Sequence, residues 1–246
     1  MAAPLTLKLN AYTELSSADR AGFEALSRRS IREVCARRDL IREGDRPRSV
    51  FLILSGWACR YKTLPDGRCQ IVALVLPGDL CDLHVHALRT MDHSVGAITP
   101  LQAAEIGGDE FEQLLQDHPR IAQALYWDEL VKIAIQREWT VNLGQRSAYE
   151  RIAHLLCECH LRLRAVGLAQ EHSCPFPLTQ ADLADATGLT TVHVNRTLQE
   201  LRKDGVIELY GRKLHVPNLQ RLKSAALFNA NYLHLDHEGR HLDAGD

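Results

Sequence analysis

The C-terminal third of the chain carries two short apolar patterns at helical spacing, separated by one glycine. In the first pattern, Thr179 and Asp182 form the capping box that opens a helix, and Leu183 and Ala184 supply its buried face. Gly188 ends this helix, because glycine readily adopts the positive φ of a tight turn between two helices. The pattern therefore predicts the first half of a helix-turn-helix.

A second helical pattern follows directly, and Thr190 is its expected N-cap. Val194, Leu198 and Leu201 recur at steps of three and four, so they predict the buried face of this helix. The β-prone runs on either side of residues 210–212 predict a small hairpin wing. Together the segments have the spacing of a winged helix-turn-helix.

The outward positions of the second helix suit the major groove of duplex DNA. Arg196 can donate two parallel bonds to guanine, Asn195 can pair with adenine, and Val192 can contact a thymine methyl group. A helical hairpin buried inside an enzyme is the alternative, but it does not call for a polar outer face beside a basic wing. The candidate DNA-binding residues are Thr179, Gln180, Thr190, Thr191, Val192, His193, Asn195, Arg196, Gln199, Arg212 and Lys213.

From residue 40 to 106 the pattern changes to short β-prone runs separated by turn signals. Runs of this length and spacing predict a β-roll or sandwich. Residues 65–67, with the sequence Pro-Asp-Gly, predict a hairpin turn. Val50, Leu52 and Leu54 alternate along one run, and we expect them to point into the core.

Helical patterns flank this β-rich region. Residues 17–37 predict one or two short helices before it, and 119–142 predict a long helix that Gly144 should end. We expect part of the long helix's apolar stripe to cover the roll and the rest to pair with a second copy about a two-fold axis. Burial of the whole helix within one subunit is the alternative. The stripe consists of Ile121, Ala124, Trp127, Val131, Ile135 and Trp139.

The predicted fold is therefore α+β, with an N-terminal jelly-roll-like β-roll sensor domain, a long dimerisation helix and a C-terminal winged helix-turn-helix. The expected boundaries are 1–118 for the roll with its N-terminal helices, 119–143 for the long helix and 144–233 for the winged domain. The last domain should begin with a helix at 148–165 and end with one from 219 to about 232. The tail, 234–246, is expected to be disordered.

Composition limits the partners and the cellular location that such a protein can have. The chain has 246 residues, enough for two cores, and a formal charge of −2, so only a local basic face could hold DNA. Its seven irregularly spaced cysteines fit reduced thiols. No apolar stretch reaches the roughly 20 residues that span a bilayer, and no charged leader precedes an apolar core. We expect a cytoplasmic protein that does not contact membranes.

The order of β-roll, long helix and winged helix-turn-helix resembles the Crp-Fnr family of bacterial transcription regulators over nearly the whole chain. The motifs that carry the resemblance are LIREGDRPRSVFLILSG, PDGRCQIVALVLPGD and LTQADLADATGLTTVHVNRTLQELRKDGVI. It implies a homodimer that binds a palindromic operator, has RNA polymerase as a second partner and is not an enzyme. We predict no bound cofactor.

The sequence departs from this family at the effector site. Members that bind cyclic AMP offer a glycine and a glutamate to the ribose, then an arginine and a serine to the phosphate. Here the aligned residues are Asp82, Leu83, His93 and Ser94, so only the serine is kept. Without the arginine clamp we do not expect cyclic AMP to bind.

Two further departures concern iron and the operator. Oxygen-sensing members hold an iron-sulfur cluster on N-terminal cysteines, and this chain has no cysteine before Cys35. The family commonly pairs a glutamate with the arginine at Arg196, but Val192 stands at the glutamate position. Since valine cannot accept a bond from cytosine, the operator should differ at that base pair.

Two histidine groups leave a metal hypothesis open. His84 and His86 follow Gly78 as in the opening of the cupin metal motif, so a metal-dependent cupin-like enzyme, or a metal- or haem-responsive sensor, is the alternative function. Cys81 and His93 are further candidate ligands there. A second candidate group, His154, Cys157 and His160, steps by three along one predicted helix.

Overall fold

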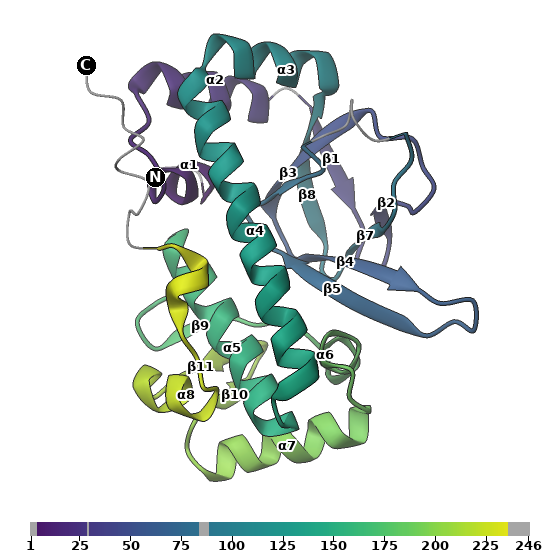
Figure 1. Cartoon of the computed structure of the whole chain (residues 1–246), viewed down its shortest axis with the longest axis vertical. Coiled ribbons are helices and arrows are strands. Elements are labelled where there is room, and N and C mark those ends of the chain that lie inside the picture. Colours follow the sequence, from purple (N-terminus) through teal and green to yellow (C-terminus); the bar gives the residue numbers. More distant parts are fainter. Residues whose placement is uncertain (1–3, 29, 84–88, 236–246) are drawn as a thin grey trace. The chain divides into compact units, whose positions relative to one another are not determined.

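The computed structural model describes residues 4–28, 30–83 and 89–235, and the chain forms two compact units. The first unit comprises the described parts of 1–62 and 73–130, with Leu235. The second comprises 63–72 and 131–234. Figure 1 shows the helices and strands of both. No helix in the described part of the chain has the length and apolar character that crossing a membrane requires. Most of the predicted disordered tail, from residue 236 on, lies outside the described residues.

The first unit is a β-roll with helices before and after its strands. Two of its elements, β5 and α4, continue into the second unit. In chain order the elements are α1 (Pro4–Asn10), α2 (Ser17–Ser27), β1 (Ile31–Val34), β2 (Asp39–Ile41), β3 (Ser49–Ser55), β4 (Ala58–Thr63), β5 (Cys69–Val75), β6 (Leu80–Cys81), β7 (Ser94–Ala97), β8 (Leu101–Gly107), α3 (Gly108–Asp117) and α4 (Pro119–Gln145).

The strands form two four-stranded sheets, in the orders β1-β8-β3-β6 and β2-β7-β4-β5. Apolar side chains from both sheets make one buried core, including Phe51 and Leu101 from the first and Val95 from the second. This confirms the predicted roll. The turn at 65–67 is also confirmed, because Gly67 has a φ of +87° and its N–H donates to the Leu64 carbonyl at 2.9 Å.

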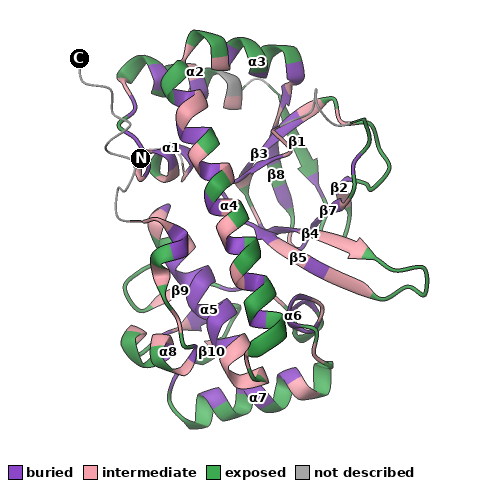
Figure 2. Ribbon diagram, in the orientation of Figure 1, coloured by how far each residue is buried: buried purple, intermediate pink, exposed green. Residues whose placement is uncertain are grey.

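The expected burial of Val50, Leu52 and Leu54 is confirmed for the first two, but β3 does not alternate between a buried and an exposed face. Val50 and Leu52 are buried, but so are Phe51 and Ile53, whereas Leu54 is half-buried. The reason is that β3 lies inside its sheet, with the second sheet on one face and helix α3 in contact with it. Figure 2 shows purple, buried residues along the middle of β3.

The N-terminal region also differs from the expectation. Residues 31–34 form strand β1, paired antiparallel with β8, where short helices were predicted. Helix α1, which the pattern did not predict, packs against the glycine turn before β6, where a Cβ on Gly78 would lie 3.0 Å from the Leu5 nitrogen. Its Lys8 Nζ lies 2.6 Å from both Asp79 Oδ1 and Asp128 Oδ1. Burial opposes a charge on Lys8, but Asp128 and Asp79 outweigh it and raise the Lys8 pKa above its ordinary value.

The second unit contains the end of α4 and a helical domain with a three-stranded sheet, ordered β10-β11-β9. Strand β9 was not predicted. The elements are α5 (Ala148–Ala165), β9 (Ser173–Pro175), α6 (Gln180–Thr187), α7 (Thr191–Lys203), β10 (Glu208–Tyr210), β11 (Lys213–His215), α8 (Leu219–Ala225) and the 3₁₀ helix η1 (Ala230–Leu233).

Two predicted helix ends need correction. Gly144 does not end α4, which continues to Gln145. The break between the two helices comes where the capping box of Ser147 and Glu150 begins α5. The single last helix predicted to reach residue 232 is two pieces, α8 and η1. Leu227 between them has a φ of +46°, which no α-helical residue adopts.

Helix α4 has apolar residues on two opposite faces. The predicted stripe is buried within the chain itself, with Trp127 half-buried and the other five members below one-tenth exposed. The prediction that the rest of this stripe pairs with a second copy is therefore wrong, because these side chains are already buried. The opposite face instead exposes Tyr126, Leu130, Ile133 and Val141, at 69%, 42%, 45% and 47%.

We predict that Lys8→Met destabilises the first unit by about 3 to 5 kcal/mol, because two buried carboxylates lose the ammonium group that lies 2.6 Å from each. Urea unfolding followed by circular dichroism measures this. The matched control is Arg28→Met, which breaks the exposed pair with Glu24 and should cost under about 1 kcal/mol. Equal losses in both variants would contradict the role given to Lys8.

Candidate nucleic-acid interface

The first helix of the predicted motif, α6, begins at the predicted capping box. The Asp182 N–H donates to Thr179 Oγ1 at 3.2 Å, and the Thr179 N–H donates to Asp182 Oδ2 at 2.8 Å. Leu183 and Ala184 are buried, as predicted. Gly188 follows at φ +66°, in the left-handed conformation, and so turns the chain into the next helix.

The second helix, α7, has the two predicted faces. Its N-cap is Thr190, whose Oγ1 accepts from the His193 N–H at 3.2 Å. Val194, Leu198 and Leu201 are at most 3% exposed. The outer face is polar except for Val192, which is 80% exposed. The exposed members of that face are Thr191, Val192, Asn195, Arg196 and Gln199, and His193 is half-buried.

The wing is a tight hairpin of β10 and β11. Gly211 and Arg212 join the strands with φ of +55° and +59°, as a two-residue type I′ turn requires. Tyr210, expected in the turn, is the last residue of β10 and is 60% exposed. Strand β9 pairs with β11 on its other edge, so the exposed Arg212 and Lys213 stand on a three-stranded sheet.

Sequence reasoning missed two exposed basic residues at the end of α7, Arg202 and Lys203. The signal that could have found them is the run of basic residues before the wing. With Arg196, Arg212 and Lys213, they give this part of the second unit five exposed cations. Exposed cations beside a polar helix suit a phosphate backbone.

Arg151 on α5 joins the end of α4 to the helix-turn-helix. Its side chain donates to the carbonyls of Asn142 and Leu143 in the last turn of α4 and of Arg146 just after it, at 2.9 to 3.1 Å. The same guanidinium donates to the Thr187 carbonyl, the last of α6, at 2.7 Å. One side chain therefore satisfies the free carbonyls of two helices. No sequence pattern predicted this role of Arg151.

A buried carboxylate makes a second joint between α4 and α5. Trp139 Nε1 on α4 donates to both oxygens of Glu158 on α5, at 3.1 and 3.2 Å. The hydroxyl of Tyr232 in η1 donates to the same carboxylate at 3.0 Å, and Arg162 lies 3.3 Å away. Burial raises the Glu158 pKa, and Arg162 with the hydrogen bonds opposes that rise.

The candidate metal residues of α5 belong to this buried interior. Burial lowers the His154 pKa to about 3, so its ring is neutral, and burial raises the Cys157 pKa to about 12. His154 Nε2 lies 3.4 Å from Glu138 Oε1. His160 is also fully buried. Across the described residues, no three histidine, cysteine or acidic side chains are grouped as a metal site.

The candidate effector residues lie in the first unit, at β6 and β7. Ser94 Oγ accepts from the Glu43 N–H at 3.0 Å. His93 lies between two carboxylates, with Nδ1 2.7 Å from Asp92 Oδ1 and Nε2 3.6 Å from Asp82 Oδ1. The hydrogen bond from His93 holds the Asp92 pKa below its ordinary value. Leu83 is half-buried beside them.

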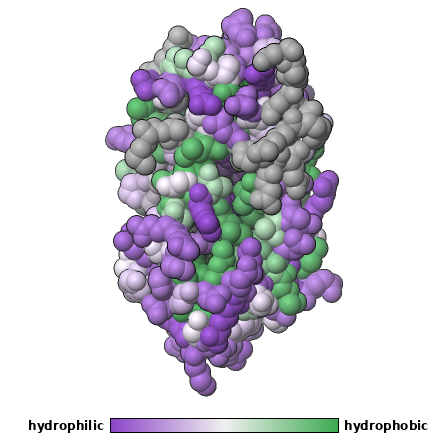
Figure 3. Space-filling model, turned by 90° about the vertical axis from the view of Figure 1, so that its left-hand side faces the viewer, coloured by the Kyte–Doolittle hydropathy of each residue, from purple (hydrophilic) through white to green (hydrophobic). Residues whose placement is uncertain are grey.

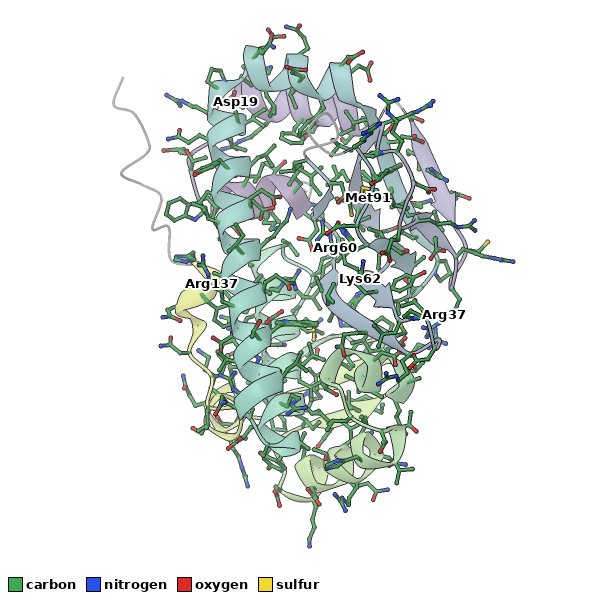
Figure 4. All side chains as sticks on the ribbon, turned by 45° about the vertical axis from the view of Figure 1, so that its right-hand side comes forward. Asp19, Arg37, Arg60, Lys62, Met91 and Arg137 are labelled. Atoms are coloured by element: carbon green, nitrogen blue, oxygen red, sulfur yellow. The ribbon has the colours of Figure 1, made fainter. Side chains whose placement is uncertain are left out.

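The remaining residues of the metal hypothesis are not brought together. Cys81 lies in the apolar core of the roll and is 0% exposed. His84 and His86 lie outside the described residues. Two basic side chains that the sequence did not single out, Arg60 and Lys62 on β4, lie nearby (Figure 4). Arg60 donates to the Leu80 carbonyl at 3.5 Å, and Lys62 contacts Glu43 and the Asp92 carbonyl.

Two family models match the chain in the order of its units. One, described as a cyclic nucleotide-binding domain, matches residues 31–118. The other, described as a Crp-like helix-turn-helix domain, matches residues 150–225.

Named relatives agree with these matches. The chain is 33% identical over 177 residues to the transcriptional activator protein FnrL of Cereibacter sphaeroides, covering 71% of each. It is 31% identical over 198 residues to the nitrogen fixation regulation protein FixK of Bradyrhizobium diazoefficiens, covering 80% of this chain and 81% of that one. The solved structure of FixK2 from Bradyrhizobium japonicum is similar with a TM-score of 0.72 and 25% identity, over 82% of this chain and 98% of that one.

We predict that Arg151→Met lowers the free energy of unfolding by at least about 3 kcal/mol, because four charge-assisted hydrogen bonds are lost at two helix ends. Denaturant unfolding followed by tryptophan fluorescence measures the loss. Arg164→Met, an exposed change on the same helix, is the control and should stay within about 0.5 kcal/mol of the wild type. An Arg151→Met protein as stable as this control would show that the joint contributes nothing.

Proposed function

Because the chain belongs to the Crp/Fnr family of transcription regulators, with a DNA-binding helix-turn-helix and a sensor domain, we propose that it binds a palindromic operator as a homodimer. The observation that carries the proposal is α7, a helix with a fully buried inner face and an exposed polar outer face, flanked by a basic wing. Such a helix enters the major groove with its N-terminal residues against base edges.

Each side chain of this face has a specific role in the proposal. Arg196 binds guanine through two parallel bonds, Asn195 binds adenine, and exposed Val192 contacts a thymine methyl. Valine offers no acceptor to cytosine, so the operator differs there from operators read by a glutamate. The other candidate residues contact the phosphate backbone or, in the case of His193, either a phosphate or a base. They are Thr179, Gln180, Thr190, Thr191, His193, Gln199, Arg212 and Lys213.

Dimerisation uses the exposed face of α4, not the stripe predicted from the sequence. Tyr126, Leu130, Ile133 and Val141 recur at steps of four, three and eight, so they follow one side of the helix. Figure 3 shows that some apolar side chains reach the surface in the space-filling view. Arg137, on the same side of α4, is the polar member of this face (Figure 4). A parallel pair of such helices gives the two-fold axis that a palindrome requires.

The roll does not use cyclic AMP in this proposal. A phosphate at the family's position would meet Asp82 and Asp92 around His93, with no arginine among the four aligned residues. The one retained group, the Ser94 hydroxyl, already accepts a bond from the Glu43 backbone. This position therefore offers a phosphate two carboxylates in place of the family's arginine clamp.

The proposed role in transcription also determines the second partner, the location and the chemistry of the protein. The second partner is RNA polymerase, the protein acts in the cytoplasm where bacterial DNA lies, and it has no catalytic role or resident cofactor of its own. The relatives are transcription regulators, and they favour this function over a cupin-like enzyme or a metal sensor.

We predict that Arg196→Ala weakens binding to the specific operator by about 1 to 3 kcal/mol and relaxes the preference at one base pair per half-site. Binding to random DNA should change much less. Lys213→Ala should weaken both kinds of DNA alike and reduce the salt slope by about one, because a phosphate contact releases counterions without distinguishing bases. Competition binding at several salt concentrations measures both. Unchanged sequence preference in Arg196→Ala would place base recognition elsewhere.

We predict that Leu130→Glu converts the dimer to a monomer and with it lowers operator affinity, because a carboxylate would be buried between two helices. Analytical ultracentrifugation gives the mass. Leu168→Glu is the matched control, since Leu168 is 38% exposed and lies in the loop after α5. A Leu130→Glu protein that still sediments as a dimer would rule out this interface.

A further inference from the structure

A small cavity opens beside the roll core in the first unit. Its volume is about 180 Å³, and its floor includes Leu40, Ile41 and Phe51, all at most 8% exposed. Its walls come from β1, β8 and the loop that leads into β3. None of the four aligned effector residues lines it.

Three arginines line this cavity, Arg32 from β1 and Arg46 and Arg48 from the loop. None of the three guanidinium groups has an ion-pair partner among the described residues. Asp45 and Glu105 also line it, but Asp45 Oδ2 accepts from the Arg42 N–H at 3.2 Å and so caps its own loop. The cavity lining therefore carries three cations against two carboxylates, and among the described residues no ion pair joins them.

One guanidinium and the backbone of the arginine loop have fixed contacts in the roll. The Arg32 guanidinium carbon lies 5.7 Å from the centre of the Phe51 ring, within the range of a cation–π contact. The loop is fixed at both ends, by the Met91 N–H donating to the Asp45 carbonyl at 2.8 Å and the Gly108 N–H donating to the Arg48 carbonyl at 3.1 Å. Pro47 between the two loop arginines restricts Arg46 to an extended backbone.

We propose that this cavity binds a small oxyanion, a phosphate or a carboxylate, through Arg32, Arg46 and Arg48. Guanidinium groups bind both kinds of anion through paired, charge-assisted hydrogen bonds. The volume lies below the roughly 300 Å³ at which pockets for drug-sized ligands begin, so the ligand is smaller than a nucleotide. The apolar floor and the half-buried Glu105 leave room for a short carbon chain or a hydroxyl beside the charged end.

Isothermal titration calorimetry of the full chain tests the proposal with three probes: orthophosphate, pyrophosphate and succinate, each against chloride at matched ionic strength. The wild type should bind at least one of the three saturably, with one site per chain. The variant Arg46→Gln/Arg48→Gln changes only exposed loop side chains, and it should bind at least about tenfold more weakly. The matched control Arg28→Gln/Arg68→Gln removes two exposed, ion-paired arginines and should bind as the wild type does.

The outcomes distinguish which anion binds and whether it binds in this cavity. Preference for the phosphates or for succinate identifies the chemistry of the ligand, and either supports the site. Binding that survives in Arg46→Gln/Arg48→Gln would overturn the proposal, because the anion would then sit elsewhere, such as at the DNA-binding face. The absence of saturable binding for all three probes, or an equal loss in the control variant, would overturn it too.

Discussion

The guanidinium of Arg151 is the contact on which the arrangement of the second unit depends. Helix ends leave carbonyls without partners, and here the ends of α4 and α6 are satisfied by one side chain from α5. The Asn142 side chain returns a bond to the Arg151 carbonyl at 3.4 Å. Because Thr187 directly precedes the Gly188 turn, the position of the DNA-binding helix is fixed relative to the end of α4.

The two apolar faces of α4 have different contacts. Its buried face supplies Trp139 to the carboxylate of Glu158, and its exposed face carries Tyr126, Leu130 and Ile133. A helix that must both hold its own domain and meet a second copy needs apolar residues on opposite sides, and this explains why one stripe alone could not describe it. The proposed dimer and the observed joint therefore use different residues.

Local sequence signals predicted most of the helix-turn-helix. Elements that depend on contacts between residues far apart in the sequence were not predicted. The Thr179 capping box and the Gly188 turn depend on neighbours within a few residues, so the sequence alone specifies them. Helix α1 depends on Lys8 meeting Asp79 and Asp128, far along the chain, and β9 depends on its pairing with β11. Arg151 acts on backbone carbonyls, which every residue has, so no pattern of side chains could have revealed it.

The central claim is that two copies of α7 bind DNA about a two-fold axis, and selection of operators from a random DNA pool tests it most directly. The account predicts one enriched sequence made of two inverted half-sites, their centres about one helical turn, or roughly 10 base pairs, apart or a multiple of it. The complex should hold two chains per site. An enriched sequence without inverted symmetry, bound by a single chain, would contradict the account.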